Sequence, residues 1–324
     1  GLGDVYKRQI IYSLPFISID IFIWFVWLSI CVQSVRAEER IREYIEKVQL
    51  RQMIVLPLLV LLIAFGIIGA TYLTTGYPVH MGYEFVGGTV VSFASDKTPE
   101  EIMKDFEEYN PVSVKNYGER KLIEFPPLTE EQLTSIRSKL SGYKDVEIRQ
   151  TSPLFGKTLQ VQAIKAVLIA FFGMAIVVFI IFRTFVPSVA VVLSAFSDIV
   201  ISIALMNIFG IKLTLATVAA LLMLIGYSVD SDILLTNRLL RRKGEFTDRL
   251  VGAMKTGLTM TLTSLFAAFI LFLVSSYSYV VSPAYTRIDI LADIAVVLIF
   301  GLSVDIMNTW MLNAGLLRWY LTKK

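Results

Sequence analysis

The stretch LTLATVAALLMLIGYSVDSDILL (residues 213–235) decides the fold class, because it is a long apolar run that contains two acidic residues, Asp230 and Asp232. At about 1.5 Å per residue, a helix of this length can cross a lipid bilayer. A charged side chain inside such a span costs on the order of 2.5–3.5 kcal/mol on insertion scales. The stretch therefore predicts a membrane protein with a functional polar site within the membrane.

Other apolar runs lie on both sides of this one, and a long polar region separates the first run from the rest. They cover residues 53–73, 162–182, 187–209, 257–275 and 288–317. The pattern predicts an α-helical membrane protein: a six-helix transmembrane bundle with an external α+β domain between the first and second spans. We expect residues 35–75 to form a cytoplasmic lead and the first helix, 76–158 the external domain, and 159–324 the five-helix region.

The composition agrees with this class and excludes several others. The chain is 55% hydrophobic and 18% charged, against about 45–50% and about 25% in soluble domains. Its net charge of +3 is too small and too scattered to indicate a nucleic-acid partner. The single cysteine, Cys31, excludes an internal disulfide, and the single histidine, His80, argues against a His-based metal site or a Ser-His-Asp hydrolase. We therefore expect no metal and no cofactor.

The N-terminal residues differ in character from the rest of the chain. Residues 1–9 read GLGDVYKRQ and resemble a translated sequencing adapter, so we interpret residues 1–34 as a non-native extension. Residues 10–33 have the length and apolarity of a further span, although Pro15 and Asp20 weaken that interpretation. Translated upstream sequence and a real helix remain alternatives for this segment.

Basic residues in the short connections predict the orientation. Lys and Arg occur in residues 36–51, at Arg183, in residues 238–255 and at the C-terminus. An alternating path through six spans places all four groups on one side, and such groups favour the cytoplasm. We therefore predict a multi-pass protein of the cytoplasmic membrane, with the C-terminus and the native N-terminus both cytoplasmic.

The polar region between the first two spans predicts a β-α-β-β-α-β order. Strand-like segments cover residues 88–94, 112–116, 121–125 and 145–150. Thr98 with Glu101, and Thr129 with Gln132, form two capping boxes that open helices. This order is that of the ferredoxin-like split βαβ plan, which by itself indicates no chemistry.

Aspartates inside the spans are the candidates for function. Asp198 lies in the third span, Asp230 and Asp232 in the fourth, and Asp305 in the sixth. The functional interpretation is a proton or ion relay, and the structural alternative is that some of them reach water or cap a neighbouring helix. We expect Asp230 to matter more than Asp232, because it lies deeper and shares a helix face with Gly226.

Two motifs resemble those of a known family. The chain reads GYEFVGG after the first span, and IGYSVDSD in the fourth span with an arginine six residues later. Together with the span layout, these resemble the archaeal form of SecF, in the SecD/SecF family of protein-export membrane proteins and the resistance-nodulation-division superfamily. The matched positions are Gly82, Glu84, Phe85, Gly87, Gly88, Gly226, Tyr227, Ser228 and Arg238.

The resemblance implies an auxiliary, non-enzymatic role in Sec-dependent protein export, coupled to the proton gradient. The implied partners are SecD, a SecYEG-type channel, the exported polypeptide and membrane lipid. Bacterial relatives usually carry Asn-Asp where this chain has Asp230 and Ser231, so their acidic residue falls at Ser231 and either flanking aspartate could replace it.

Two other classes of membrane protein are alternatives to this one. A half-size resistance-nodulation-division transporter of a small molecule or lipid would have six spans, although such proteins usually have two repeats. An intramembrane aspartyl protease would need a Tyr-Asp and a Gly-x-Gly-Asp motif in facing helices, and neither occurs in the predicted spans.

Overall fold

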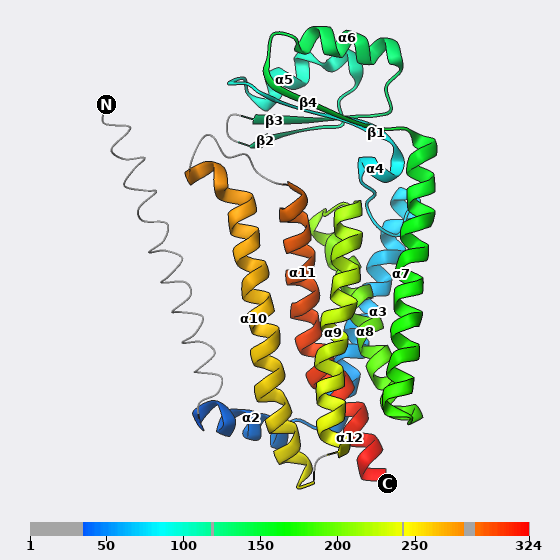
Figure 1. The fold of residues 1–324 in the computed structure, drawn as a ribbon, viewed down its shortest axis with the longest axis vertical. Coiled ribbons are helices and arrows are strands. Elements are labelled where there is room, and N and C mark those ends of the chain that lie inside the picture. The colour runs from blue at the N-terminus through cyan, green and yellow to red at the C-terminus, as the bar shows by residue number, and fades with distance from the viewer. Residues whose placement is uncertain (1–34, 118–119, 242, 282–288, 324) are drawn as a thin grey trace, which may run out of the picture.

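The computed structural model describes residues 35–117, 120–241, 243–281 and 289–323 (Figure 1). The segment 1–34, with its possible helix over residues 10–33, lies outside the described residues. In the described part, a bundle of long helices supports a small α+β domain at one end. This arrangement agrees with the fold class predicted from the sequence.

Six helices are long and apolar enough to cross a membrane, among the residues that the structure describes. A short amphipathic helix, α2 (Val35–Lys47), precedes them at the end of the bundle opposite the α+β domain. The spans are α3 (Leu50–Thr75), α7 (Pro153–Phe182), α8 (Phe185–Phe209), α9 (Leu215–Arg241), α10 (Phe246–Val281), and a last span made of α11 (Asp289–Met307), η2 (Asn308–Asn313) and α12 (Ala314–Lys323).

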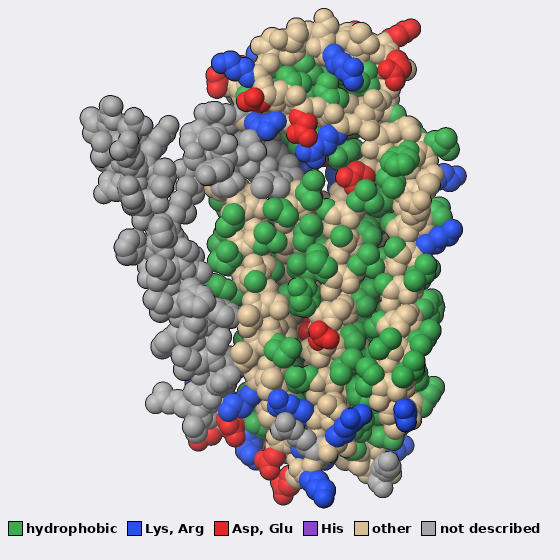
Figure 2. Space-filling view, in the orientation of Figure 1, with side chains coloured by type: hydrophobic (Ala, Val, Ile, Leu, Met, Phe, Trp, Pro, Cys, Tyr) green, Lys and Arg blue, Asp and Glu red, His purple; other side chains and the backbone are tan. Residues whose placement is uncertain are grey.

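The spans differ in how much of their surface lies inside the bundle. In the apolar windows of α8, α9 and the last span, 67%, 56% and 44% of the residues are buried, against 6% for α7 and 17% for α10. Apolar side chains cover much of the visible flank of the bundle, as expected for a surface that faces lipid (Figure 2). Many of the polar residues on α8, α9 and the last span therefore lie in the interior, although Asp230 and Ser303 are exposed.

The α+β domain follows the predicted order of elements. After the single turn α4 (Tyr83–Val86) come β1 (Gly88–Ala94), α5 (Pro99–Asp105), η1 (Glu107–Tyr109), β2 (Ser113–Tyr117), β3 (Arg120–Phe125), α6 (Glu130–Leu140) and β4 (Lys144–Thr151). Both predicted capping boxes are present, at Thr98 and at Thr129. The strands form an antiparallel sheet in the order β2-β3-β1-β4, which is the ferredoxin-like arrangement.

The two faces of this sheet have different roles, because successive side chains of a strand point to opposite sides. Helices α5 and α6 cover one face, where Phe93, Ile123 and other apolar residues form the domain core. The opposite face is turned towards the ends of the membrane helices (Figure 1). Its side chains, including Ser92 and Glu124, are mostly polar or charged, so this face is not a second hydrophobic core.

Candidate functional site

Three of the four predicted aspartates meet inside the helix bundle. Asp198 on α8, Asp232 on α9 and Asp305 on α11 have exposed fractions of 0%, 0% and 1%. We call them, with the side chains that bind them, the aspartate cluster. Such burial inside a membrane span carries a large desolvation cost unless each carboxyl group is hydrogen-bonded.

Asp198 has one partner on each of the two neighbouring spans. Ser228 Oγ donates to Asp198 Oδ2 at 2.5 Å, and Asn308 Nδ2 donates to Asp198 Oδ1 at 2.7 Å. Both carboxyl oxygens are thereby satisfied, and α8 is joined to α9 and to the last span.

Asp232 and Asp305 are bridged by one hydroxyl group. Thr309 Oγ1 lies 3.0 Å from Asp232 Oδ1 and 3.0 Å from Asp305 Oδ1. A threonine hydroxyl carries one proton and can donate it to only one acceptor at a time. Two full hydrogen bonds form at once when one of the two carboxyl groups carries a proton and donates it to Thr309, whereas two ionised carboxylates would have to share the single hydroxyl proton. The geometry therefore fits a shared proton at this pair.

The remaining bonds of the pair come from α9 and from the end of the last span. Ser231 Oγ lies 3.1 Å from each oxygen of Asp305, and Asn313 Nδ2 donates to Asp232 Oδ1 at 2.7 Å. Asp232 Oδ2 is buried and has no hydrogen-bond partner within the described part of the chain. This oxygen is available to a proton or to water.

A π-helical turn supplies three of the polar partners. The turn is η2, and it carries Asn308, Thr309 and Asn313. Single π turns inside α-helices occur frequently at functional sites. These three residues were not among the predicted site residues, although three polar residues close together in a largely apolar span were a usable signal.

Asp230 does not belong to the aspartate cluster. It is exposed on the outer side of α9, together with Gly226 and Tyr227. No other part of the described chain lies within 4 Å of a Cβ atom built at Gly226, so this glycine is not packed closely against another helix of the chain. The structure thus reverses the expected placement of Asp230 and Asp232, because Asp232 is the buried one.

Arg238 and several other polar residues of the spans have separate roles. Arg238 donates to the Gly252 carbonyl and, at 2.8 Å, to Thr256, so it joins α9 to α10. Thr259 and Thr263 donate to backbone carbonyls four residues earlier on α10, a local bond that hydroxyl groups in helices often make. Asn207 binds the segment after α3 rather than any aspartate.

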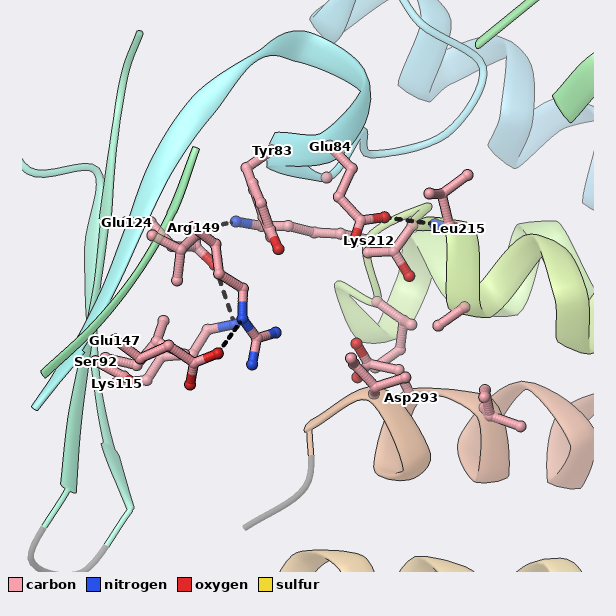
Figure 3. A pocket seen from close by; sticks show the side chains of 18 of the residues that line it. Tyr83, Glu84, Ser92, Lys115, Glu124, Glu147, Arg149, Lys212, Leu215 and Asp293 are labelled. Carbon is pink, nitrogen blue, oxygen red and sulfur yellow. Dashed lines mark hydrogen bonds and ion pairs between the residues drawn. The ribbon is translucent and has the colours of Figure 1, made fainter. Parts of the chain in front are cut away.

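The GYEFVGG motif forms a joint between the α+β domain and the spans. Glu84 Oε2 accepts the backbone N–H of Leu215 at 2.7 Å, at the first residue of α9 (Figure 3). An acidic side chain is favourable there, because a helix N-terminus carries unpaired N–H groups and partial positive charge. Gly82 N also donates to the Leu213 carbonyl at 2.8 Å. The motif therefore holds the start of α9.

The same motif holds the start of α7. Gln160 Nε2 donates to the Phe85 carbonyl at 2.8 Å. A side chain at Gly156 would come within 2.5 Å of that carbonyl oxygen, and one at Gly87 within 2.8 Å of Pro153. Gly87 also has φ +88°, a conformation that other residues rarely adopt. These glycines are required by close backbone contact.

A partly buried ion pair adds a direct contact between the sheet and the connection that leads into α9. Lys212 donates to Glu124, and Lys115 lies 3.4 Å from the same carboxylate. Burial by itself would raise the pKa of Glu124, but the hydrogen bond from Lys212 and the charges of both lysines lower that pKa below its usual value. Glu124 is therefore ionised at neutral pH and binds the α+β domain to the spans.

Comparisons with known proteins identify the family. The model of the family "Protein export membrane protein SecD/SecF, C-terminal" matches residues 131–323. The "Protein-export membrane protein SecF" of Methanolacinia petrolearia is 46% identical over 281 residues, which are 86% of this chain and 96% of that protein. Its namesake in Haloferax volcanii is 46% identical over 274 residues, with 83% and 92% covered.

The chain belongs to the SecF family. The SecF of Pyrococcus furiosus is 45% identical over 288 residues, 85% of this chain and 92% of that protein. SecF membership agrees with the resemblance found in the sequence, and it makes this chain a multi-pass membrane protein. The alternative of a half-size transporter is not supported.

Solved structures support the fold. The crystal structure of SecDF from Thermus thermophilus, described as a translocon-associated membrane protein, matches with a TM-score of 0.65 and 21% identity. The match covers 84% of this SecF chain but 38% of the SecDF chain. A SecDF structure in a "super-membrane-facing form" has a TM-score of 0.54 at 19% identity.

Proposed function

We propose that this chain is an auxiliary subunit of the Sec protein-export machinery, which acts with SecD and a SecYEG-type channel to assist the translocation of polypeptides across the cytoplasmic membrane. Its relatives are named protein-export membrane proteins, and its fold is that of a translocon-associated protein. The proposal includes no covalent chemistry. The protein acts by moving a proton and by changing conformation.

The observation that carries the proton part is the Thr309 hydroxyl between Asp232 and Asp305. With one proton on the pair, both 3.0 Å contacts are satisfied. With none, two carboxylates compete for one hydroxyl proton, and their like charges repel in a medium of low dielectric constant. Loss of the proton therefore favours a different packing of α9 against the last span.

Movement of α9 has a direct route to the α+β domain. The start of α9 is held by Glu84 and Gly82, and Lys212, just before it, binds Glu124 on the sheet. A tilt or shift of α9 displaces these contacts. We propose that proton binding and release at the aspartate cluster in this way change the position of the α+β domain.

The distribution of charge supports the orientation predicted from the sequence. Lys and Arg side chains gather at the end of the bundle opposite the α+β domain (Figure 2). By the positive-inside rule, that end is cytoplasmic and the α+β domain is external. A cysteine introduced at Ser135, on α6, should react with an impermeant reagent in intact cells. Reaction only after the membrane is broken would overturn this orientation.

The exposed face of α9 supports an association with SecD. Asp230 lies in an apolar span and is exposed, and a charge that contacts lipid at this position is costly. A second membrane subunit packed over this face would provide it with polar partners. We propose that SecD packs there. Whether Asp230 also takes part in proton transfer stays a prediction.

The proposed function is tested by complementation. Cells depleted of the protein receive the native chain, Asp305→Asn, or the control Asp96→Asn, which changes an exposed aspartate of the α+β domain. We expect Asp305→Asn to insert and to co-purify with SecD but to lose the gradient-dependent part of reporter export, and the control to restore it. Normal export with Asp305→Asn would contradict the relay, and loss of assembly would indicate a structural role.

A further inference from the structure

A cleft of about 910 Å³ lies between the polar face of the sheet and the nearby end of the helix bundle (Figure 3). Its roof is the polar face of the sheet, with Ser92 on β1, Lys115 on β2 and Arg149 on β4. Its floor is formed by the connection from α8 to α9 and by the start of α11. This volume is near the upper end of the range of ligand-binding pockets, about 300–1,000 Å³.

The roof presents charges of both signs. Arg149 Nε donates to Glu147 Oε1 at 2.8 Å, and Lys115 lies 3.4 Å from Glu124. The Arg149 guanidinium extends into the open part of the cleft in Figure 3. The side chains of Arg149 and Glu147 remain 49% and 48% exposed, so both can bind a further group.

The charges of the roof persist at neutral pH. The neighbouring Arg149 lowers the pKa of Glu147, and Glu147 in turn raises the pKa of Arg149. A ligand with a single negative charge would meet Glu147 and Glu124 as well as the cations. A chain with both N–H donors and C=O acceptors can instead bind the cations and the anions together.

The floor adds apolar surface. Ile211, Leu215, Ile290 and Ile294 line it, and Ile290 is 46% exposed. An occupant that suits this cleft therefore combines a polar backbone with side chains of varied character. An extended, unfolded polypeptide has this chemistry.

We infer that the cleft binds an extended segment of the exported polypeptide. The inference rests on the proposed function and deepens it, because it places the contact with the substrate beneath the sheet. The ion pair between Glu124 and Lys212 joins the roof of the cleft to its floor. A movement of α9 would therefore change the width of the cleft, and so would couple the aspartate cluster to the hold on the polypeptide.

Site-specific photo-crosslinking in cells tests this inference. A photoreactive amino acid replaces Ser92 or Lys115 in the cleft, or the control Ser138, which is exposed on α6 on the other side of the sheet. A secreted reporter is arrested during export, and adducts with reporter and with lipid are separated by mass. Lys115 lies on the edge strand β2 and is 46% exposed, so it serves if the Ser92 variant does not assemble.

We expect reporter adducts at the cleft positions to exceed those at Ser138 by about tenfold. Equal adducts at all positions, adducts with lipid alone, or no adduct from a variant that restores export would each overturn the inference while leaving the proposed function intact. If the native chain itself does not stimulate export, the proposed function fails and the inference falls with it.

Discussion

Replacing Thr309 by valine tests the shared hydroxyl with little change in side-chain shape. Thr309 is fully buried, and its hydroxyl makes the 3.0 Å contacts to both Asp232 and Asp305. Asp232 keeps its bond from Asn313 and Asp305 keeps that from Ser231, so neither loses every partner. The loss of two bonds at about 1 kcal/mol each amounts to about 2 kcal/mol.

This loss of free energy should weaken the step that couples proton movement to export. Since 1.4 kcal/mol corresponds to a factor of ten, we expect gradient-dependent export in inverted vesicles to fall by about ten- to a hundredfold. Insertion and association with SecD should be retained. The matched control is Thr263→Val, because Thr263 bonds only to the backbone carbonyl of its own helix and is exposed. Equal activity of the two variants would refute the role of the shared hydroxyl.

Three further predictions concern the aspartates, the ion pair and the joint. Asp232→Asn should reduce gradient-dependent export more than Asp230→Asn, because only Asp232 lies in the aspartate cluster; the opposite order in the same assay would reverse the assignment. The lowered pKa of Glu124 provides stability that is present above its ordinary pKa of 4.5 and is lost as pH falls through the lowered value. The thermal unfolding temperature of Glu124→Gln in nanodiscs should therefore depend less on pH in this range than that of the native protein. An unchanged pH dependence would argue against the ion pair. Gly156→Ala should destabilise the joint by about 1–3 kcal/mol, because its methyl group overlaps the Phe85 carbonyl. The control Gly173→Ala, on the same helix, meets no atom and should be neutral. Equal unfolding temperatures of the two variants would contradict the predicted overlap at Gly156.

The sequence predicted the architecture because apolar runs and capping boxes are local signals. The six spans and the two helices that open at Thr98 and Thr129 follow from such signals. The order of the strands also agrees, since the β-α-β-β-α-β sequence has few ways of packing.

The details of the site depend on long-range packing and were harder to predict. Asp230 and Asp232 are two residues apart on a helix of 3.6 residues per turn, so they face nearly opposite directions, and the sequence does not say which one faces inward. The π turn that carries Thr309 shifts the helical register, and a span read as a regular helix does not place that hydroxyl between two carboxyl groups.

We propose that the buried aspartates carry protons across the membrane during export, and proton movement is the most direct measure of that role. The purified chain is reconstituted with SecD and the channel in vesicles that contain a trapped pH-sensitive dye. With a gradient imposed, we predict proton flux that rises when a polypeptide is being exported and that is abolished by Asp305→Asn. The same flux in the native and the Asp305→Asn proteins would contradict a proton relay through the aspartate cluster.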